Sequence, residues 1–172
     1  MNEKSNLPIS TAVAVYPVTN RQELRKFIDV PWIVYANDPV WVPPLRLERR
    51  WHFSKSNPFF GHGEWQAWIA YRDNKPVGRI SAQIDQLHRQ RYGADTGHFG
   101  LLESVNDKEV FSGLMQTAEK WLVERGTKNV SGPYNFSINQ ECGVLVSGFL
   151  YTTDAADDVC RVNLCRPSII QK

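Results

Sequence analysis

The side chains of this chain that are capable of acid–base chemistry gather in a few short stretches. His98 and Glu103 bracket the apolar run FGLL. His98 is a candidate base because its ordinary pKa lies near neutrality, and Glu103 directly follows the apolar strand. Plainer interpretations remain open: a half-exposed histidine at a strand edge, and a capping or surface carboxylate. His62 and Glu64 flank Gly63, so on a strand they would share a face and could line a cleft, although polar loop residues would look the same.

Arg79 is the most suggestive cation in the sequence. Strand alternation through VGRIS places Val77, Arg79 and Ser81 on one face. An arginine in that position can bind the carboxylate or phosphate of a ligand. The alternative that we favour is an internal ion pair, for which Asp85 is the expected partner.

The densest polar motif is GPYNFSINQECG. Its polar residues alternate with Phe136, Ile138 and Gln140, so an extended chain would present them on one face: Asn135, Ser137, Asn139 and Glu141. Amide and hydroxyl donors in a row suit an oxyanion, and a glutamate at the end suits an amine. A turn-rich loop that satisfies its own backbone would have the same composition.

The elements that would position these residues can be predicted from periodicity and turn signals. We expect a strand over 11–18, a helix capped at Asn20 that breaks at Pro31, and a second short helix up to Asp38. The segments 64–73 and 76–85 predict an antiparallel hairpin around Asn74, and 96–104 a third strand. A helix capped by Asn106–Asp107 should reach Arg125–Gly126, before a short strand that Gly132–Pro133 interrupts. The order predicts an α+β domain, a mixed α/β arrangement with a largely antiparallel sheet.

The segment 38–63 is loop-like and rich in aromatic residues. Two interpretations apply to its largest side chains, Trp41, Trp51, Phe53, Phe59 and Phe60. They could be plugs that fasten a long connection to the core, which we favour, or the apolar lining of a cleft.

Composition bounds the function. With a formal net charge of +2, the chain gives no support to nucleic-acid binding; its local basic clusters, 46–50 and 88–91, are solvated faces or sites for a phosphate-bearing ligand. No apolar run approaches the ~20 residues of a membrane span. The three cysteines have no disulfide or metal-ligand spacing, which predicts a reducing, cytoplasmic environment and no metal site. Residues 1–10 are expected to be a flexible leader without a signal peptide.

Four stretches carry a resemblance to a known family: FIDVPWIVYANDPVWVPPLRLERR, NPFFGHGEWQAWIAYRDNKPVGRISAQID, GHFGLLES and GPYNFSINQECGVLVSGF. The order of elements resembles the GNAT-like acyl-CoA N-acyltransferase fold, and the motifs resemble its bacterial ceramide synthase-like family. The resemblance implies a GNAT-like domain over 11–149. It also implies transfer of an acyl group from a thioester, acyl-CoA or acyl-carrier protein, to an amine of lipid or amino-alcohol type, with no permanently bound cofactor.

In this family Glu103 stands where the base often emerges, and the polar row from Asn135 would suit pantetheine. In GNAT folds the pyrophosphate of the coenzyme typically sits at a helix N-terminus. The phosphate loop that normally binds it, Gln/Arg-x-x-Gly-x-Gly/Ala, is missing here, and Glu103, Asp107 and Glu109 stand where pyrophosphate would approach. Acidic side chains near a helix N-terminus are ordinary capping, the interpretation that we favour; a dianionic ligand there would be repelled unless Lys108 or another cation compensates their charge.

Residues 150–172 differ in texture from the rest, and we expect them to be a divergent, disordered or frameshifted tail. Codon degeneracy allows this tail, read one nucleotide later, to encode the Pro-Pro-Met and Met-Met segments with which such relatives continue. We therefore expect a fold that is incomplete at its C-terminus and an activity impaired by truncation. Two alternatives to an active enzyme stay open: a non-catalytic ligand-binding or regulatory protein on the same fold, and an inactive remnant.

Overall fold

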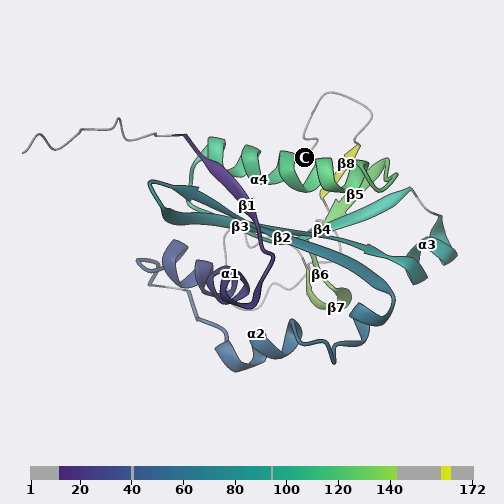
Figure 1. Ribbon diagram of the computed structural model, residues 1–172, viewed down its shortest axis with the longest axis horizontal. Helices are drawn as coiled ribbons and strands as arrows, with labels where there is room; N and C mark the ends of the chain where they lie inside the picture. The colour runs from purple at the N-terminus through teal and green to yellow at the C-terminus, as the bar shows by residue number, and fades with distance from the viewer. Residues whose placement is uncertain (1–11, 40, 94, 143–159, 164–172) are drawn as a thin grey trace, which may run out of the picture.

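The computed structural model describes residues 12–39, 41–93, 95–142 and 160–163, with the backbone alone for 137–142 and 160–163. A six-stranded sheet forms the middle layer (Figure 1), in the order β1 (Ala14–Pro17), β2 (Gly63–Arg72), β3 (Lys75–Asp85), β4 (Thr96–Ser104), β5 (Asn129–Gly132) and β8 (Cys160–Asn163). All neighbours are antiparallel except β4 and β5. The predicted α+β fold with a largely antiparallel sheet is confirmed.

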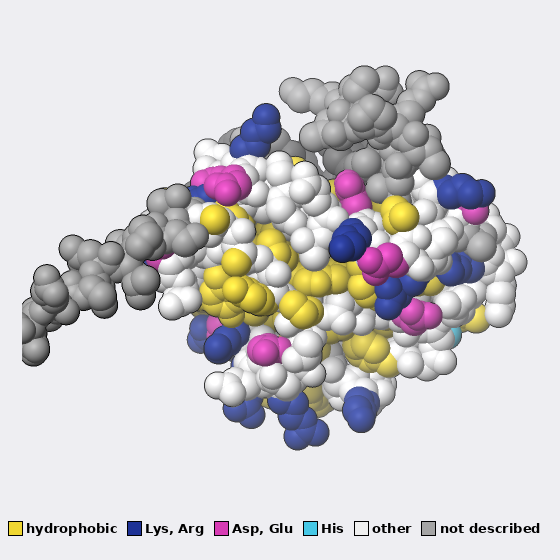
Figure 2. All heavy atoms as spheres, turned by 45° about the horizontal axis from the view of Figure 1, so that its top comes forward, with side chains coloured by type: hydrophobic (Ala, Val, Ile, Leu, Met, Phe, Trp, Pro, Cys, Tyr) yellow, Lys and Arg dark blue, Asp and Glu magenta, His cyan; other side chains and the backbone are white. Residues whose placement is uncertain are grey.

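Helices cover both faces of this sheet. The long helix α4 (Lys108–Val123) lies on one face, and α1 (Arg21–Val34) lies on the other, with α2 (Arg46–His52) outside it (Figure 1). A single 3₁₀ turn, η1 (Pro58–Gly61), leads into β2, and α3 (Gln86–Tyr92) joins β3 to β4. When the molecule is turned so that the top of Figure 1 comes forward, the surface shows basic and acidic side chains interspersed among apolar ones (Figure 2).

The hairpin of β2 and β3 forms as predicted. Its two turn residues, Asp73 and Asn74, have φ angles of 50° and 61°. Two successive positive φ values match the twist of a two-residue hairpin, and Asp and Asn tolerate them better than most residues. A bulge between Ala70 and Tyr71 then shifts the register, and beyond it Arg79 lies opposite Ile69.

β3 is buried on both faces but is apolar on only one. Ile80, Ala82 and Ile84 pack toward α4, in a core that includes Val110, Leu114, Ala118 and Leu122. The alternating residues Arg79, Ser81 and Gln83 are buried on the opposite face, under α1. Burying polar side chains costs free energy unless they are hydrogen-bonded, so this face is a candidate location for a functional site.

β4 contains a bulge that changes which way its side chains point. Between the pairs Ser81–Gly100 and Arg79–Glu103, β4 contains one residue more than β3. Leu101, within this stretch, has a φ of 49°. Phe99 and Leu102 pack toward α4, whereas Leu101 joins Phe27 and Ile69 on the α1 side. Beyond the bulge, Glu103 lies opposite Arg79, on the face of the sheet that carries the polar row of β3.

Asn20 caps α1 as predicted, because its side chain accepts hydrogen bonds from the amides of Gln22 and Glu23. The predicted break at Pro31 is wrong, since α1 runs through it to Val34. Proline has no N–H to donate to the carbonyl of Phe27. Arg79 Nη1 donates to that carbonyl instead, at 2.9 Å, so a tertiary contact supplies the bond that the helix lacks.

The connections hold more helix than the sequence indicated. α2 and η1 both lie in the stretch interpreted as a loop, and α3 was not predicted. Asp85 begins α3 by accepting from the amides of Leu87 and His88. These helices are short, so their apolar periodicity is too brief to be read.

α4 begins at the predicted cap, Asp107, and the chain turns at Gly126, where φ is 78°. β5 then ends at Gly132, and the cis peptide to Pro133 separates it from the small hairpin of β6 (Tyr134–Asn135) and β7 (Ser137–Cys142). The predicted interruption at Gly132–Pro133 is confirmed. β8 lies beside β5, inside the stretch that the sequence set apart as a tail.

Candidate active site

Arg79 and Glu103 form the centre of the polar face. Arg79 is only 4% exposed, and its Nε forms an ion pair with Glu103 Oε2. The guanidinium also lies over the ring of Phe27, with Cζ 4.9 Å from the centroid. The predicted internal ion pair exists, but the predicted partner is wrong: Asp85 lies six residues along β3, whereas Glu103 is the cross-strand neighbour of Arg79.

A cavity of about 220 Å³ opens beside this pair. Its lining combines three charged residues with apolar and aromatic ones: Ile28, Pro31, Trp32, Trp41, Val42, Pro44, Arg49, Arg79 and Glu103. Arg49 is itself buried although it belongs to α2, the outer helix. The cavity therefore brings a carboxylate and two arginines to an apolar wall, which suits a ligand with a polar end and an apolar body.

Tyr35, which caps the C-terminal end of α1, was not among the predicted site residues. Burial, and next the negative charge of Glu103, raise the pKa of its hydroxyl above its ordinary value. The raised pKa makes the hydroxyl a weaker acid, so at neutral pH Tyr35 acts as a hydrogen-bond donor. The influence of Glu103 on it depends on the packing of α1 on β4, which no local pattern reveals.

Aromatic residues serve two purposes on this face. Trp41 packs against Trp32 and Tyr35, with ring centroids 5.6 and 5.4 Å apart, and lines the cavity. Phe53, Phe59 and Phe60 instead pack on Phe136 or Trp65, as the plug interpretation expects. Trp51 does neither, since it is 76% exposed.

A second polar group lies at the far end of β3. His62 Nδ1 and Asp85 Oδ1 are 2.9 Å apart, which ties η1 to the start of α3. His98 packs edge-on against His88 and Tyr134, at centroid distances of 4.9 and 5.1 Å. Five residues separate His98 from Glu103 along β4, which is about 15 Å of strand, so the two candidate bases do not share one site.

His98 does not have the neutral-range pKa that the sequence suggested. Burial, and then the charge of His88, lower its pKa from 6.5 to about 4. An imidazole with that pKa stays neutral at pH 7 and is a weak base. Glu64, the neighbour of His62, pairs with Arg125 of the chain segment after α4, at 3.1 Å.

A larger hollow, of about 360 Å³, lies at the edge of the sheet between β1 and α1. Its lining contains Tyr16, Tyr71 and Glu23, and the Glu23 carboxylate already accepts hydrogen bonds from the amide and hydroxyl of Thr19. Those contacts lower the pKa of Glu23 and leave it a structural cap. We therefore place the candidate site at the smaller cavity.

Among the residues that the structure describes, no three His, Cys, Asp or Glu side chains are grouped so as to hold a metal ion. No described helix has the length and apolarity needed to cross a membrane.

Comparison with known proteins gives relatives in sequence and in fold, although no family model matches the chain. It is 49% identical over 130 residues to Protein YghO of Escherichia coli K12, covering 76% of this chain and 33% of that protein. It is 47% identical over 139 residues to the bacterial ceramide synthase of Caulobacter vibrioides, covering 80% of this chain and 36% of that protein. The chain thus spans about a third of the length of these curated relatives.

Solved structures share its architecture. A tandem GNAT protein from the clavulanic acid biosynthesis pathway aligns with a TM-score of 0.52 and 13% identity, covering 69% of this chain and 35% of that one. An aminoglycoside acetyltransferase from an uncultured soil sample aligns with a TM-score of 0.51 and 14% identity, covering 71% and 77%. The chain is a GNAT-fold homologue of bacterial ceramide synthase.

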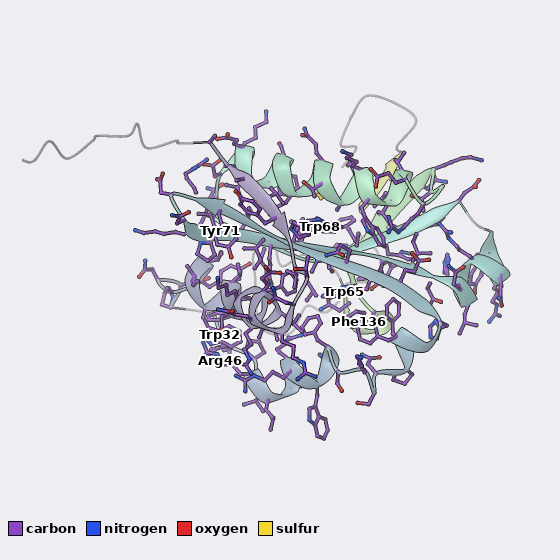
Figure 3. All side chains as sticks on the ribbon, in the orientation of Figure 1. Trp32, Arg46, Trp65, Trp68, Tyr71 and Phe136 are labelled. Atoms are coloured by element: carbon purple, nitrogen blue, oxygen red, sulfur yellow. The ribbon has the colours of Figure 1, made fainter. Side chains whose placement is uncertain are left out.

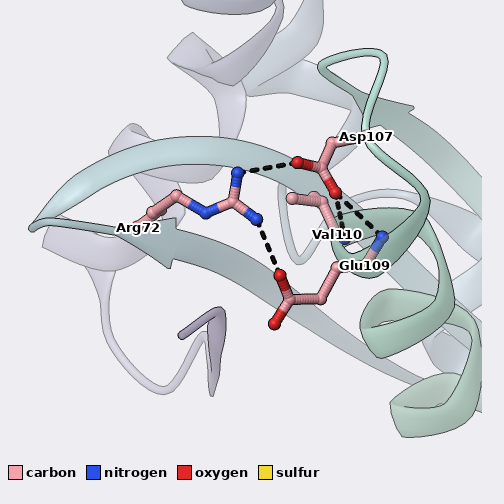
Figure 4. A network of polar contacts seen from close by, with 4 residues as sticks. All are labelled: Arg72, Asp107, Glu109 and Val110. Carbon is pink, nitrogen blue, oxygen red and sulfur yellow. Dashed lines mark hydrogen bonds and ion pairs between the residues drawn. The ribbon is translucent and has the colours of Figure 1, made fainter. Parts of the chain in front are cut away.

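In this GNAT-fold homologue the N-terminus of α4 is already occupied by carboxylates (Figure 4). Asp107 accepts from the amides of Glu109 and Val110, and Arg72 pairs with Asp107 at 2.7 Å and with Glu109 at 2.9 Å. The hydrogen bond from Arg72 is the largest cause that lowers the pKa of Asp107. Arg72, on β2, therefore compensates the acidic cap, as the cation other than Lys108 for which the sequence analysis allowed.

The polar row from Asn135 is only partly described in the GNAT-fold homologue. Asn135 lies in β6, and the next amide, Phe136 N, donates to Gln83 Oε1 of the buried row at 3.1 Å. Ser137, Asn139 and Glu141 are on β7, and their side chains lie outside the described part of the structure. Their predicted roles remain predictions.

Proposed function

We propose that this chain forms the core of an N-acyltransferase that moves an acyl group from a thioester to an amine. The observation that carries the proposal is the cavity that brings Glu103, Arg79 and two tryptophans together on the α1 face of a GNAT-type sheet. The relation to bacterial ceramide synthase supports the same reaction class. The acyltransferase-like unit would comprise residues 11–149.

Direct transfer needs no covalent enzyme intermediate. A neutral amine attacks the thioester carbonyl, so that a C–N bond forms, the C–S bond breaks and the thiol leaves. In our proposal Glu103 accepts the proton of the amine, while Arg79 fixes the carboxylate in place. The hydroxyl of Tyr35, protonated at neutral pH as in any tyrosine, donates a hydrogen bond to the leaving thiolate, which takes up its proton from solvent. His98, with a pKa of about 4, is not needed as the base.

The size and lining of the cavity bear on the substrate. Its ~220 Å³ is less than the roughly 300–1,000 Å³ of a site that encloses a drug-sized ligand. It would therefore hold the reacting ends of the two substrates, with longer parts extending outward. Trp32 and Trp41 offer apolar contact to an acyl chain or a lipid-type amine, and acyl-CoA and acyl-carrier protein are both candidate donors.

One observation favours a second candidate, a non-catalytic binding protein on the same fold. The acidic cap of α4 uses the amides that a coenzyme pyrophosphate would need at that helix. An acyl-CoA donor would thus have to place its phosphates elsewhere. A protein that binds a ligand in the cavity without transferring an acyl group would not meet this difficulty.

The experiment compares thiol release from a panel of acyl-CoAs in the presence of a long-chain amino alcohol. We expect activity in the intact chain and a loss of at least about 100-fold in Glu103→Gln, the usual contribution of a general base. The matched control is Glu119→Gln, on α4 and on the other side of the sheet, which should be unaffected. Saturable binding of an acyl thioester without thiol release, under all conditions, would favour the second candidate.

A further inference from the structure

The exposed apolar side chains of this chain are concentrated around α2. Ten large apolar side chains are well exposed among the described residues, and four of them fall between residues 42 and 51. These four are Val42, Leu45, Leu47 and Trp51, each more than two-thirds exposed. Single exposed apolar residues are ordinary, but a contiguous group indicates contact with another surface.

Positive charge accompanies these apolar residues. The stretch 45–55 contains four basic residues and one acidic residue, whereas the whole chain has a formal net charge of +2. Arg46 is neutralised by Asp29 at 2.9 Å and lies over the ring of Trp32 (Figure 3). Arg50 and Lys55 are exposed and form no ion pair with a described residue.

The helix geometry places the two kinds of side chain side by side. At 100° per residue, Leu47 and Trp51 are one turn apart, and Arg50 lies next to them on the same face of α2. The opposite side carries Arg49, which is buried against the cavity. α2 is also the outermost layer on its side of the sheet (Figure 1), so this face is directed away from the core.

The same surface borders the candidate site. Val42 is 75% exposed and also lines the cavity that contains Arg79 and Glu103. A molecule lying on Val42, Leu45, Leu47, Arg50 and Trp51, which we call the α2 patch, would therefore sit at the mouth of that cavity.

We propose that the α2 patch docks the chain on an anionic lipid bilayer. Apolar side chains, a tryptophan and neighbouring arginine together fit the interface of a membrane, where the rings and aliphatic groups enter the headgroup region and the cations meet anionic lipid. Among the exposed charges of the stretch 45–55 that are left after the Arg46–Asp29 pair, Arg50 and Lys55 outnumber Glu48, and this excess favours an anionic surface over a neutral apolar one. Docking would be peripheral, since α2 has seven residues and lies on the surface. It would present the cavity to lipid without requiring the chain to leave water.

Vesicle co-sedimentation tests this inference with the complete chain and without any substrate, so its outcome does not depend on acyl transfer. The probes are vesicles of phosphatidylcholine alone and vesicles with added phosphatidylglycerol. We expect binding to the anionic vesicles, weaker binding as salt is raised, and little binding to the neutral ones. Replacing Arg50 by Gln should weaken binding about five-fold, the contribution of one cation near an anionic surface.

Two matched pairs of variants distinguish binding through the α2 patch from nonspecific adsorption to vesicles. Trp51→Ser and Leu47→Ser should each weaken binding, whereas Val123→Ser, an exposed apolar residue on α4, should not. Likewise Arg50→Gln should differ from Lys120→Gln, on α4. Unchanged circular dichroism and thermal unfolding of each variant will show that its folding is preserved.

Several outcomes would overturn the proposal. Failure to sediment with anionic vesicles would do so, as would equal weakening by Arg50→Gln and Lys120→Gln. Light scattering provides the other decisive result: a dimer that Leu47→Ser or Trp51→Ser dissociates, without vesicle binding, would assign the α2 patch to a second copy of the chain.

Discussion

Arg79 offers the sharpest test of how the site is built, because three separate contacts converge on it. We consider Arg79→Met, which keeps an unbranched apolar body beside Phe27 but removes the guanidinium. The change leaves Glu103 without its cation and the carbonyl of Phe27 without a donor. Breaking a buried ion pair costs about 3–5 kcal/mol, and we take the lower part of that range because the Glu103 side chain is 24% exposed. An unsatisfied buried carbonyl adds about 1–3 kcal/mol. We expect a total loss of about 4 kcal/mol in the free energy of unfolding.

Combining Arg79→Met with a second substitution, at either of two positions, separates the loss in unfolding free energy into its parts. Glu103→Gln removes the stranded charge, so the loss on Arg79→Met should shrink by about 2 kcal/mol in its presence. Pro31→Ala restores an N–H at the position that normally bonds the Phe27 carbonyl, so the loss should shrink by about 1 kcal/mol there. Effects of Pro31→Ala on helix propensity and on the unfolded chain cancel within that cycle. Urea unfolding followed by circular dichroism, with an unchanged m-value, measures each free energy.

The reasoning would be refuted by additivity. If Arg79→Met is equally destabilising with proline or alanine at position 31, the arginine does not replace the missing helix bond. If it is equally destabilising with Glu or Gln at position 103, the ion pair has no bearing on stability and Arg79 acts by packing alone.

Further outcomes can be tested by the same unfolding measurements. The folded-state pKa of His98, about 4, is below its ordinary 6.5, so the folded protein binds fewer protons than the unfolded chain and loses stability as pH falls from 6.5 to 4. The loss should be on the order of 3 kcal/mol and should largely vanish in His98→Gln; a flat profile in the parent chain would contradict the burial argument. Gly100→Ala should destabilise by roughly 1–3 kcal/mol, since its Cβ would stand 1.8 Å from the carbonyl oxygen of Tyr134. Gly113→Ala, within α4, has its nearest contact 3.6 Å away at Val15 and should stabilise by about 0.5–1 kcal/mol; equal effects of the two changes would disprove this distinction.

The parts of the fold that were predictable are those whose cause is local. The hairpin follows from a two-residue turn that tolerates positive φ, and α4 from Asp107 as a cap followed by apolar residues at helical spacing. β4 matches the predicted strand from Thr96 to Ser104. Each of these signals resides within about twenty consecutive residues, and no distant contact overrides it.

The errors have a common physical origin in contacts between distant segments. Pro31 ends a helix by every local rule, yet α1 continues because Arg79, far along the chain, satisfies the carbonyl. The partner of Arg79 was misassigned to Asp85 because the register between β3 and β4, which selects Glu103, is not encoded in β3. Arg79 was recognised as a candidate from the alternation of its strand, and Glu103 from its place in the family resemblance. Tyr35 was missed because nothing near it in the sequence indicates the carboxylate that it approaches in space.

The bulge at Leu101 has a consequence for how the chain tolerates length changes. Side chains on a strand alternate, so a segment that contains an even or an odd number of residues between two fixed pairs delivers its last side chain to opposite faces. The extra residue in β4 sets that parity for Glu103. If Leu101 were deleted, Leu102 and Glu103 would follow Gly100 in regular alternation, and Glu103 would still stand opposite Arg79. If all residues were kept without the bulge, Leu102 would face Arg79 and the carboxylate would be directed at the apolar layer under α4. The bulge, rather than any choice of side chain, therefore decides whether this sheet has a charged site or a carboxylate buried among apolar side chains.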